Sequence, residues 1–308
     1  PIHGLKSDIE LVLLAATAGA VSYFVSGQVF SNVMFSLLLA SLFFLVGLST
    51  ELKLFKAFRQ KKSQLAVSLI AVYVLVPLLS YFFSYIPGPT GKAFLVIGVS
   101  AAALGSPRVW SNLSGSDGDL ASYTASISLM VAPLMIPALV ILSPLSIDFS
   151  MAAANLPVAA VPFVIGLLVR NYENSLIQDL RVHFSKLGFW LIVLIGAVQL
   201  RLLLQAESVF YVSKLLASSL LFTVFIVMSF GYSHLLGKLS GFYEKESRAI
   251  GFIAGSKNVA VAFFLAALVS GEVVLLVSLY YLVRQLVGLL IVDMYVHGES
   301  RFRERVGF

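Results

Sequence analysis

Long apolar stretches alternate with short polar segments along the whole chain. Ten of these stretches are long enough to cross a bilayer as helices, which needs about 20 residues each. They cover residues 9–26, 31–50, 64–85, 91–114, 118–143, 151–169, 187–205, 208–236, 247–270 and 273–296. Helices are expected because a segment in lipid must satisfy its own backbone, and these stretches are too long and too continuously apolar for barrel strands. The pattern predicts an all-α polytopic membrane protein with ten transmembrane helices.

The composition agrees with this pattern and excludes a soluble enzyme. Hydrophobic residues make up 59% of the 308 residues and charged residues only 12%, whereas soluble domains carry about 25% charged residues. The chain has no cysteine, which excludes a disulfide framework and thiol chemistry. We find no nucleophile–base pair and no metal-ligand spacing, so neither an enzyme nor a cofactor is expected.

Basic residues are concentrated in every second polar segment. If the N-terminus is cytoplasmic, fifteen of the 21 Lys and Arg residues fall in cytoplasmic segments, and Lys92, Arg201 and Lys214 fall on the opposite side. This bias predicts a multi-pass protein of the cell membrane with both termini in the cytoplasm. The net charge of +6 then faces lipid headgroups and cytoplasm, so no nucleic-acid partner is expected.

Two spans are interrupted at matching places. The fourth contains Gly105-Ser106 followed by Pro107-Arg108, and the ninth contains Gly255-Ser256 followed by Lys257-Asn258. Serine is a favoured N-cap and proline is tolerated in the first helical turn, so we expect half-helices to begin at Ser106-Pro107 and at Ser256-Lys257. Ten spans divide into five and five, here 1–150 and 151–308, and an odd number per half places the halves in opposite orientation. Interrupted spans in two inverted halves are typical of secondary transporters.

The interrupted spans also carry charge into the membrane. Arg108, Lys257 and Arg284 lie within spans, and a charge at the bilayer centre costs at least about 2.5–3.5 kcal/mol. A simple kink or a base that reaches the interface is the alternative for any one span. No Asp or Glu falls in the middle of the third, fourth, fifth, eighth or ninth span. We therefore expect a transported anion, or water in a cavity, to balance these charges.

Several of these segments resemble the bile acid:sodium symporter family, including its bacterial relatives. Residues 42–79 resemble its second and third helices, 105–137 its broken fourth and its fifth, 248–266 its broken ninth, and 284–290 ("RQLVGLL") part of its tenth. The resemblance implies two inverted five-helix repeats in which broken helices 4 and 9 cross. It further implies a panel domain of helices 1, 2, 6 and 7 and a core domain of helices 3–5 and 8–10. Substrate would bind between the domains, with transport by alternating access.

The family's sodium ligands are only partly present. Its fourth-helix signature, Pro-Gly-Gly-Thr-Ala-Ser-Asn, ends in Ser111 and Asn112 here, but Pro107-Arg108 replaces the glycine pair. In its ninth-helix signature, Glu-x-Gly-x-Gln-Asn, Ile253 replaces the glutamate and Lys257 the glutamine. The resemblance thus implies a residual first sodium site at Ser111 and Asn112 at most.

The remaining ligand positions differ as well. Val72 stands in place of the third-helix glutamine, five residues before a proline. On the fifth helix Tyr123 and Ile127 take the family positions, although Ser122, Thr124, Ser126 and Ser128 lie close by. The second sodium site is expected to be lost.

The expected function is a secondary transporter of a small organic anion without the family's two-sodium coupling. Arg108 and Lys257 would act as built-in cations, since a fixed positive charge repels a metal ion. Proton coupling through Lys257, anion exchange, uniport, sodium coupling through an altered first site, and a non-transporting membrane sensor remain alternatives. The sequence does not name the substrate. The candidate substrate- and ion-binding residues are Ser106, Arg108, Ser111, Asn112, Ser126, Ser256, Lys257, Asn258, Arg284 and Gln285.

Overall fold

The computed structural model describes residues 61–103, 106–144, 161–169 and 208–306, together with a few helical residues between 40 and 48. The first, second and seventh predicted spans and part of the sixth fall mostly or wholly outside this part. Elsewhere the predicted spans are helical. The elements are α4 (Lys62–Ile70), η2 (Ala71–Leu75), α5 (Val76–Phe83), α6 (Pro89–Val99), α7 (Ser106–Leu113), α8 (Gly118–Leu142), α11 (Ser208–Leu239), α12 (Glu244–Gly255), α13 (Val259–Ala267) and α14 (Gly271–Val306).

Six predicted spans can be compared with these elements, and their ends agree within a few residues except at the last. The third span is α4, η2 and α5, with η2 forming a π-helical turn that the sequence pattern does not predict. The fourth is broken into α6 and α7, and the ninth into α12 and α13, as expected. The last helix, α14, continues to Val306, beyond the predicted end at 296.

Three helical segments in the described ranges are long and apolar enough to cross a membrane. They cover Lys62–Phe83, Ser213–Leu239 and Gly271–His297, and α8 adds a fourth if Gly118–Ala132 and Leu134–Leu142 count as one bent span. Many large apolar side chains are exposed on these helices, including Leu134, Leu142 and Leu239. Exposed apolar surface on this scale is stable in lipid but not in water. The chain is an integral membrane protein whose described part is all-helical; the ten-helix count and the inverted repeat stay predictions.

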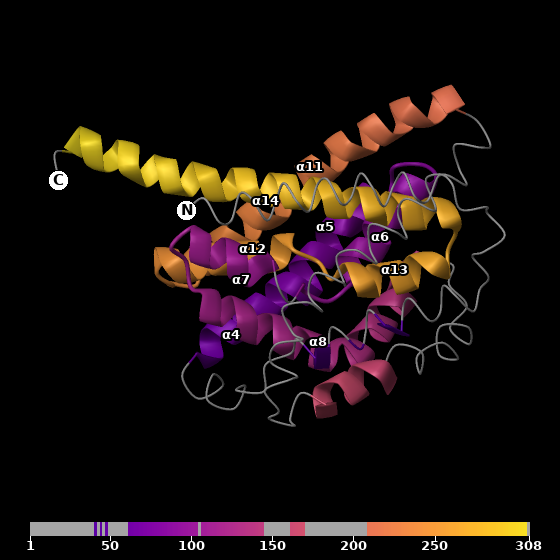
Figure 1. Ribbon diagram of the computed structural model, residues 1–308, viewed down its shortest axis with the longest axis horizontal. Coiled ribbons are helices and arrows are strands. Elements are labelled where there is room, and N and C mark those ends of the chain that lie inside the picture. Colours follow the sequence, from indigo (N-terminus) through magenta and orange to yellow (C-terminus); the bar gives the residue numbers. More distant parts are fainter. Residues whose placement is uncertain are drawn as a thin grey trace.

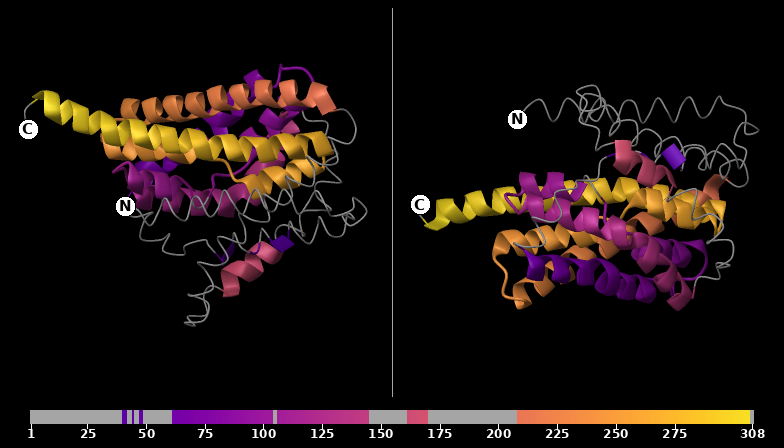
Figure 2. Two further views of the ribbon diagram at one scale, coloured as in Figure 1. Left: turned by 45° about the horizontal axis from the view of Figure 1, so that its top comes forward. Right: turned by 90° about the horizontal axis from the view of Figure 1, so that it is seen from below.

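The two broken spans meet near their middles. On one side of the meeting point α7 packs against α12, and on the other side α6 packs against α13 (Figure 1). The long helices α11 and α14 run beside them, in contact with each other (Figure 2). The fourth and ninth spans therefore meet at their breaks, and we call this meeting point the crossing; that the two helices cross as in the family stays a prediction.

Polar segments gather at two opposite ends of the bundle. At one end, Lys61 pairs with Asp117, and the Gln64 side-chain amide donates to Glu246 Oε1 at 3.0 Å. At the other end, Lys214 lies 3.8 Å from Glu272. Segments that the charge pattern assigns to the same side of the membrane are thus together.

The helical residues between 40 and 48 also contact the helix of residues 161–169. A Cβ added at Gly47 would lie 2.2 Å from the carbonyl oxygen of Phe163, and one added at Gly166 would lie 2.3 Å from that of Phe44. Only glycine allows so close an approach of two helices. These pieces belong to the second and sixth predicted spans, which are assigned to the panel domain; most of that domain lies outside the described residues.

Candidate functional site

The two breaks satisfy each other's backbone groups. The Ala103 N–H donates to the Ser256 carbonyl at 2.8 Å, and the Asn258 N–H donates to the Ala101 carbonyl at 2.7 Å. These bonds place Ala102 opposite Lys257 in a short antiparallel bridge. In a membrane interior an unpaired backbone group is costly, so each broken helix supplies the partners that the other lacks.

The first half-helix begins where the sequence predicts, but the second does not. α7 starts at Ser106 with Pro107 next, although the Ser106 hydroxyl has no hydrogen-bond partner. α13 starts at Val259, and Asn258 is its N-cap, accepting from the Val261 N–H at 3.2 Å. The prediction that Ser256 caps and Lys257 opens this helix is wrong. The bridge to Ala102 holds Lys257 extended, so the helix begins only after it, at a residue type that caps well.

Lys257 is fully buried at the crossing, with 0% of its surface exposed. Its ammonium donates to the Val72 carbonyl at 2.7 Å and to the Ser100 carbonyl at 2.9 Å. Two backbone carbonyl oxygens therefore accept hydrogen bonds from the ammonium, and these are partners that the sequence does not predict. A buried cation is tolerated when its donors are used in this way.

The Val72 carbonyl is available because of the local sequence of the third span. In η2 the Val76 N–H bonds to the Ala71 carbonyl, five residues back. The residue five positions after Val72 is Pro77, which has no N–H to donate. The π-helical turn and the proline together leave this carbonyl without a partner from its own helix, and Lys257 supplies one.

Arg284 is the second buried base at the crossing. It is only 3% exposed, and its guanidinium donates to the carbonyl of Lys257. The guanidinium carbon lies 4.8 Å from the ring centroid of Tyr281 and 6.0 Å from that of Trp110, within range of cation–π attraction. The alternative of a base that reaches the interface is excluded for Arg284. Its neighbour Gln285 is partly buried and donates to the Tyr281 hydroxyl at 3.0 Å.

The candidate residues of α7 face in two directions. Arg108 and Asn112 lie on its exposed face, whereas Ser111 is fully buried and its hydroxyl makes no hydrogen bond. Arg108 and Lys257 therefore do not form a buried pair of bases. Ser111 and Asn112, the residual sodium site implied by the resemblance, differ in exposure. Within the described residues no cluster of histidines and carboxylates could hold a metal ion.

Ser128 is the α8 hydroxyl that contacts the crossing. It accepts from the Ala102 N–H at 2.9 Å and donates to the Tyr73 hydroxyl at 3.1 Å, while the Tyr73 hydroxyl donates to the Ser128 carbonyl. Ser126, the predicted α8 residue, is buried as well. Four hydroxyl residues alternate along this segment, so the sequence contains no signal that selects Ser128.

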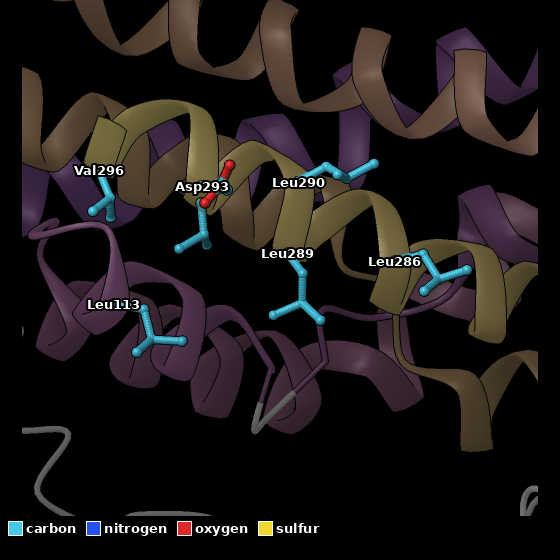
Figure 3. A pocket seen from close by; sticks show the side chains of 7 residues that line it. Leu113, Leu286, Leu289, Leu290, Asp293 and Val296 are labelled. Atoms are coloured by element: carbon cyan, nitrogen blue, oxygen red, sulfur yellow. The ribbon is translucent and has the colours of Figure 1, made fainter. Parts of the chain in front are cut away.

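A groove of about 740 Å³ runs between α7 and α14 (Figure 3). It is apolar apart from Asp293, whose carboxylate pairs with His297 at 2.9 Å. No candidate substrate-binding residue lines it, and its single charge is negative, which disfavours an anion. Its lining residues are Leu113, Leu286, Leu289, Leu290, Val292, Asp293 and Val296.

Comparison with known proteins identifies the family of this chain. No match to the chain was found among curated proteins. Residues 36–238, about two thirds of the chain, match the sodium bile acid symporter family. The match includes the first broken span but ends before α12, α13 and α14. Family members are transporters, so at the family level the protein is not an enzyme. The match extends over more than half of the sequence and agrees with the broken fourth span of the helical bundle, and the chain therefore belongs to the sodium bile acid symporter family.

Proposed function

We propose that this protein is a secondary transporter that moves a small organic anion by alternating access, without the two-sodium coupling of its family. Family membership supports transport of an organic anion. The crossing of two broken spans supports alternating access, because transporters of this kind bind their cargo where interrupted helices meet.

The observation that carries the proposal is the position of Lys257. Its ammonium is fully buried at the crossing and bonded to the carbonyls of Val72 and Ser100, which belong to the third and fourth spans. A second cation about 4 Å away would be repelled by about 4 kcal/mol at an effective dielectric constant of 20. In this proposal the Lys257 ammonium stands where a coupling sodium ion would otherwise bind, and it competes with sodium for the same space.

Arg108 is assigned a different role from Lys257 in this proposal. It lies on the exposed face of α7, in the first turn of a half-helix whose positive end favours anions. We assign Arg108 to the anion and Lys257 to the missing coupling ion.

Uptake into proteoliposomes tests the proposal. Candidate anions, including bile acids and smaller carboxylates, are first screened by thermal shift, since a ligand stabilises the state that it binds. The best binder is then measured with external sodium, potassium or choline at equal ionic strength. We expect equal initial rates in the three salts; a large acceleration by a sodium gradient would contradict the proposal.

One observation favours sodium coupling as the second candidate. The buried hydroxyls of Ser111 and Thr124 have no hydrogen-bond partner, and oxygen ligands are what a hard cation requires. If sodium accelerates uptake, Ser111→Ala should abolish the acceleration. A non-transporting sensor would bind the anion without counterflow, and proton coupling would show as pH dependence that Lys257→Gln removes.

A further inference from the structure

The site that holds the Lys257 ammonium is built from backbone atoms of other segments. Its two oxygens are the carbonyls of Val72 and Ser100, at 2.7 Å and 2.9 Å from the ammonium nitrogen. The first belongs to η2 and the second follows the end of α6. We call these two oxygens the ammonium site. Since neither belongs to the lysine, removing the lysine side chain removes the cation but leaves the site.

Local structure keeps both oxygens available. Pro77 lacks the N–H that would continue the π-helical pattern onto Val72. Ser100 ends α6 in an extended conformation, with φ −68° and ψ 157°, so its carbonyl leaves the helix axis and turns toward the crossing. The last carbonyls of a helix need partners from outside it, and here a cation is that partner.

We propose that the ammonium site is a binding site for a small monovalent cation, which Lys257 fills with its own side chain, and that Pro77 is its positioning residue. The inference rests on the proposed function, because it concerns the same lysine, but it predicts something further. With the lysine truncated, an external ammonium or sodium ion enters the site and restores the link between η2 and α6.

Thermal unfolding of the full chain in detergent, without substrate, tests this inference. Lys257→Ala is compared with the wild-type protein in ammonium chloride, sodium chloride and choline chloride at equal concentration. We expect the variant to melt lower than the wild type in choline. Ammonium should raise its melting temperature in a saturable way, as a ligand of the folded state does, while the wild type melts equally in all three salts. Equal melting of Lys257→Ala in the three salts would overturn the proposal.

Two variants serve as matched controls. Lys92→Ala removes a lysine from the exposed face of α6 and should show no response specific to ammonium. Lys257→Met removes the charge but fills the space with an apolar chain of similar length, so it should melt lower than the wild type without rescue by ammonium. Rescue of Lys257→Met to the same extent as Lys257→Ala would show that the ions act elsewhere.

A second measurement tests the ammonium site if Lys257→Ala does not fold. Pro77→Ala restores an N–H that competes with the ammonium for the Val72 carbonyl. Lys257→Met should therefore lower the melting temperature less in the Pro77→Ala background than in the wild-type background. Equal decreases in both backgrounds would show that Pro77 does not position the site.

The two proposals fail in different ways. If wild-type uptake requires sodium while ammonium still rescues Lys257→Ala, the proposed function fails and the ammonium site stands. If uptake is independent of sodium while neither rescue nor coupling to Pro77 is observed, only the ammonium site fails.

Discussion

At the scale of single residues, the crossing is held by polar atoms that find their partners in the backbone. Lys257 donates to two carbonyls, Arg284 donates to the carbonyl of Lys257, and the Tyr280 hydroxyl lies 3.3 Å from the Gly255 carbonyl, to which it donates. These bonds tie η2 and α14 to the two breaks. In the described part of the crossing, side-chain donors therefore stabilise the carbonyl groups that the interrupted helices leave without backbone partners.

Tyr73→Phe should destabilise the protein, because the tyrosine hydroxyl joins η2 to the carbonyl and hydroxyl of Ser128. Losing a hydrogen bond and leaving a buried partner unsatisfied costs about 1–3 kcal/mol. The free energy of unfolding in detergent measures the effect. Tyr85→Phe is the control, since Tyr85 is 72% exposed and its loss should cost less than about 0.5 kcal/mol. Equal stability of the two variants would show that the Tyr73 hydroxyl does not stabilise the contact between η2 and Ser128.

Glu244, in the first turn of α12 and outside the membrane-spanning segments, makes stability depend on pH. Burial opposes its ionisation, but hydrogen bonds from Lys238 and Arg248, both at 2.9 Å, outweigh it. They hold the pKa of the Glu244 carboxyl below its ordinary value. A lowered carboxyl pKa contributes stability that is fully present above the unfolded-state pKa and is lost as the pH falls through the folded-state pKa.

The melting temperature of the wild type should therefore fall toward that of Glu244→Gln as the pH decreases from about 6 to 3. At the upper end the wild type should melt higher, and at the lower end the two should coincide. A difference between them that stays constant across this pH range would contradict the assigned ion pairs.

At the scale of elements, short half-helices keep their places through close contacts with long helices. α14 approaches α7 at Gly288, where an added Cβ would lie 2.4–2.6 Å from three atoms of the Trp110 ring. Trp110 in turn lies between α14 and Phe252 of α12, with ring centroids 6.2 Å apart. A glycine on one helix thus sets the position of the indole that packs both half-helices on that side of the crossing.

Gly288→Ala should consequently destabilise the protein by about 1–3 kcal/mol, the usual cost of inserting a methyl group into a well-packed site. Gly231→Ala in α11 is the matched control, because no atom lies within 4 Å of a Cβ there and alanine favours a helix more than glycine does. Unfolding in detergent should show a loss for the first variant and none for the second. A loss of equal size in both would show that the contact with Trp110 does not account for the effect.

At the scale of the whole molecule, the ion pairs among the described residues lie mostly at one end of the bundle, with the pair of Lys214 and Glu272 at the other. The turn between α11 and α12 lies at the same end as Lys61 and Asp117, since the Asp117 N–H bonds to the Lys245 carbonyl at 3.2 Å. The turn after α5 lies at the opposite end. The distribution of basic residues predicts that the first end faces the cytoplasm.

Cysteine labelling tests this orientation directly, because the chain contains no cysteine of its own. Tyr243→Cys and Tyr85→Cys place single thiols at opposite ends, where the native side chains are 84% and 72% exposed. In intact spheroplasts a membrane-impermeant maleimide should label Tyr85→Cys at once and Tyr243→Cys only after permeabilisation. The reverse order would invert the predicted topology.

Local sequence patterns predict much of this architecture. The apolar stretches of α8, α11 and the third span, and the break before Ser106, are visible because hydrophobic length and turn-forming residues act over a few neighbouring positions. The same holds for the family signature at Ser111 and Asn112. The sequence by itself determined a helical membrane transporter with two interrupted spans.

Only the tertiary structure decided how the interruptions are stabilised. Lys257 bonds to Val72 and Ser100, which lie 185 and 157 positions away in the chain, and no local pattern encodes a pairing at that distance. The choice of Ser128 among four hydroxyl residues and the start of α13 at Val259 also depend on which backbone groups the crossing leaves open. A carbonyl's need for a partner is set by the whole fold, and for this reason the charge at the break could be located from sequence while its partners could not.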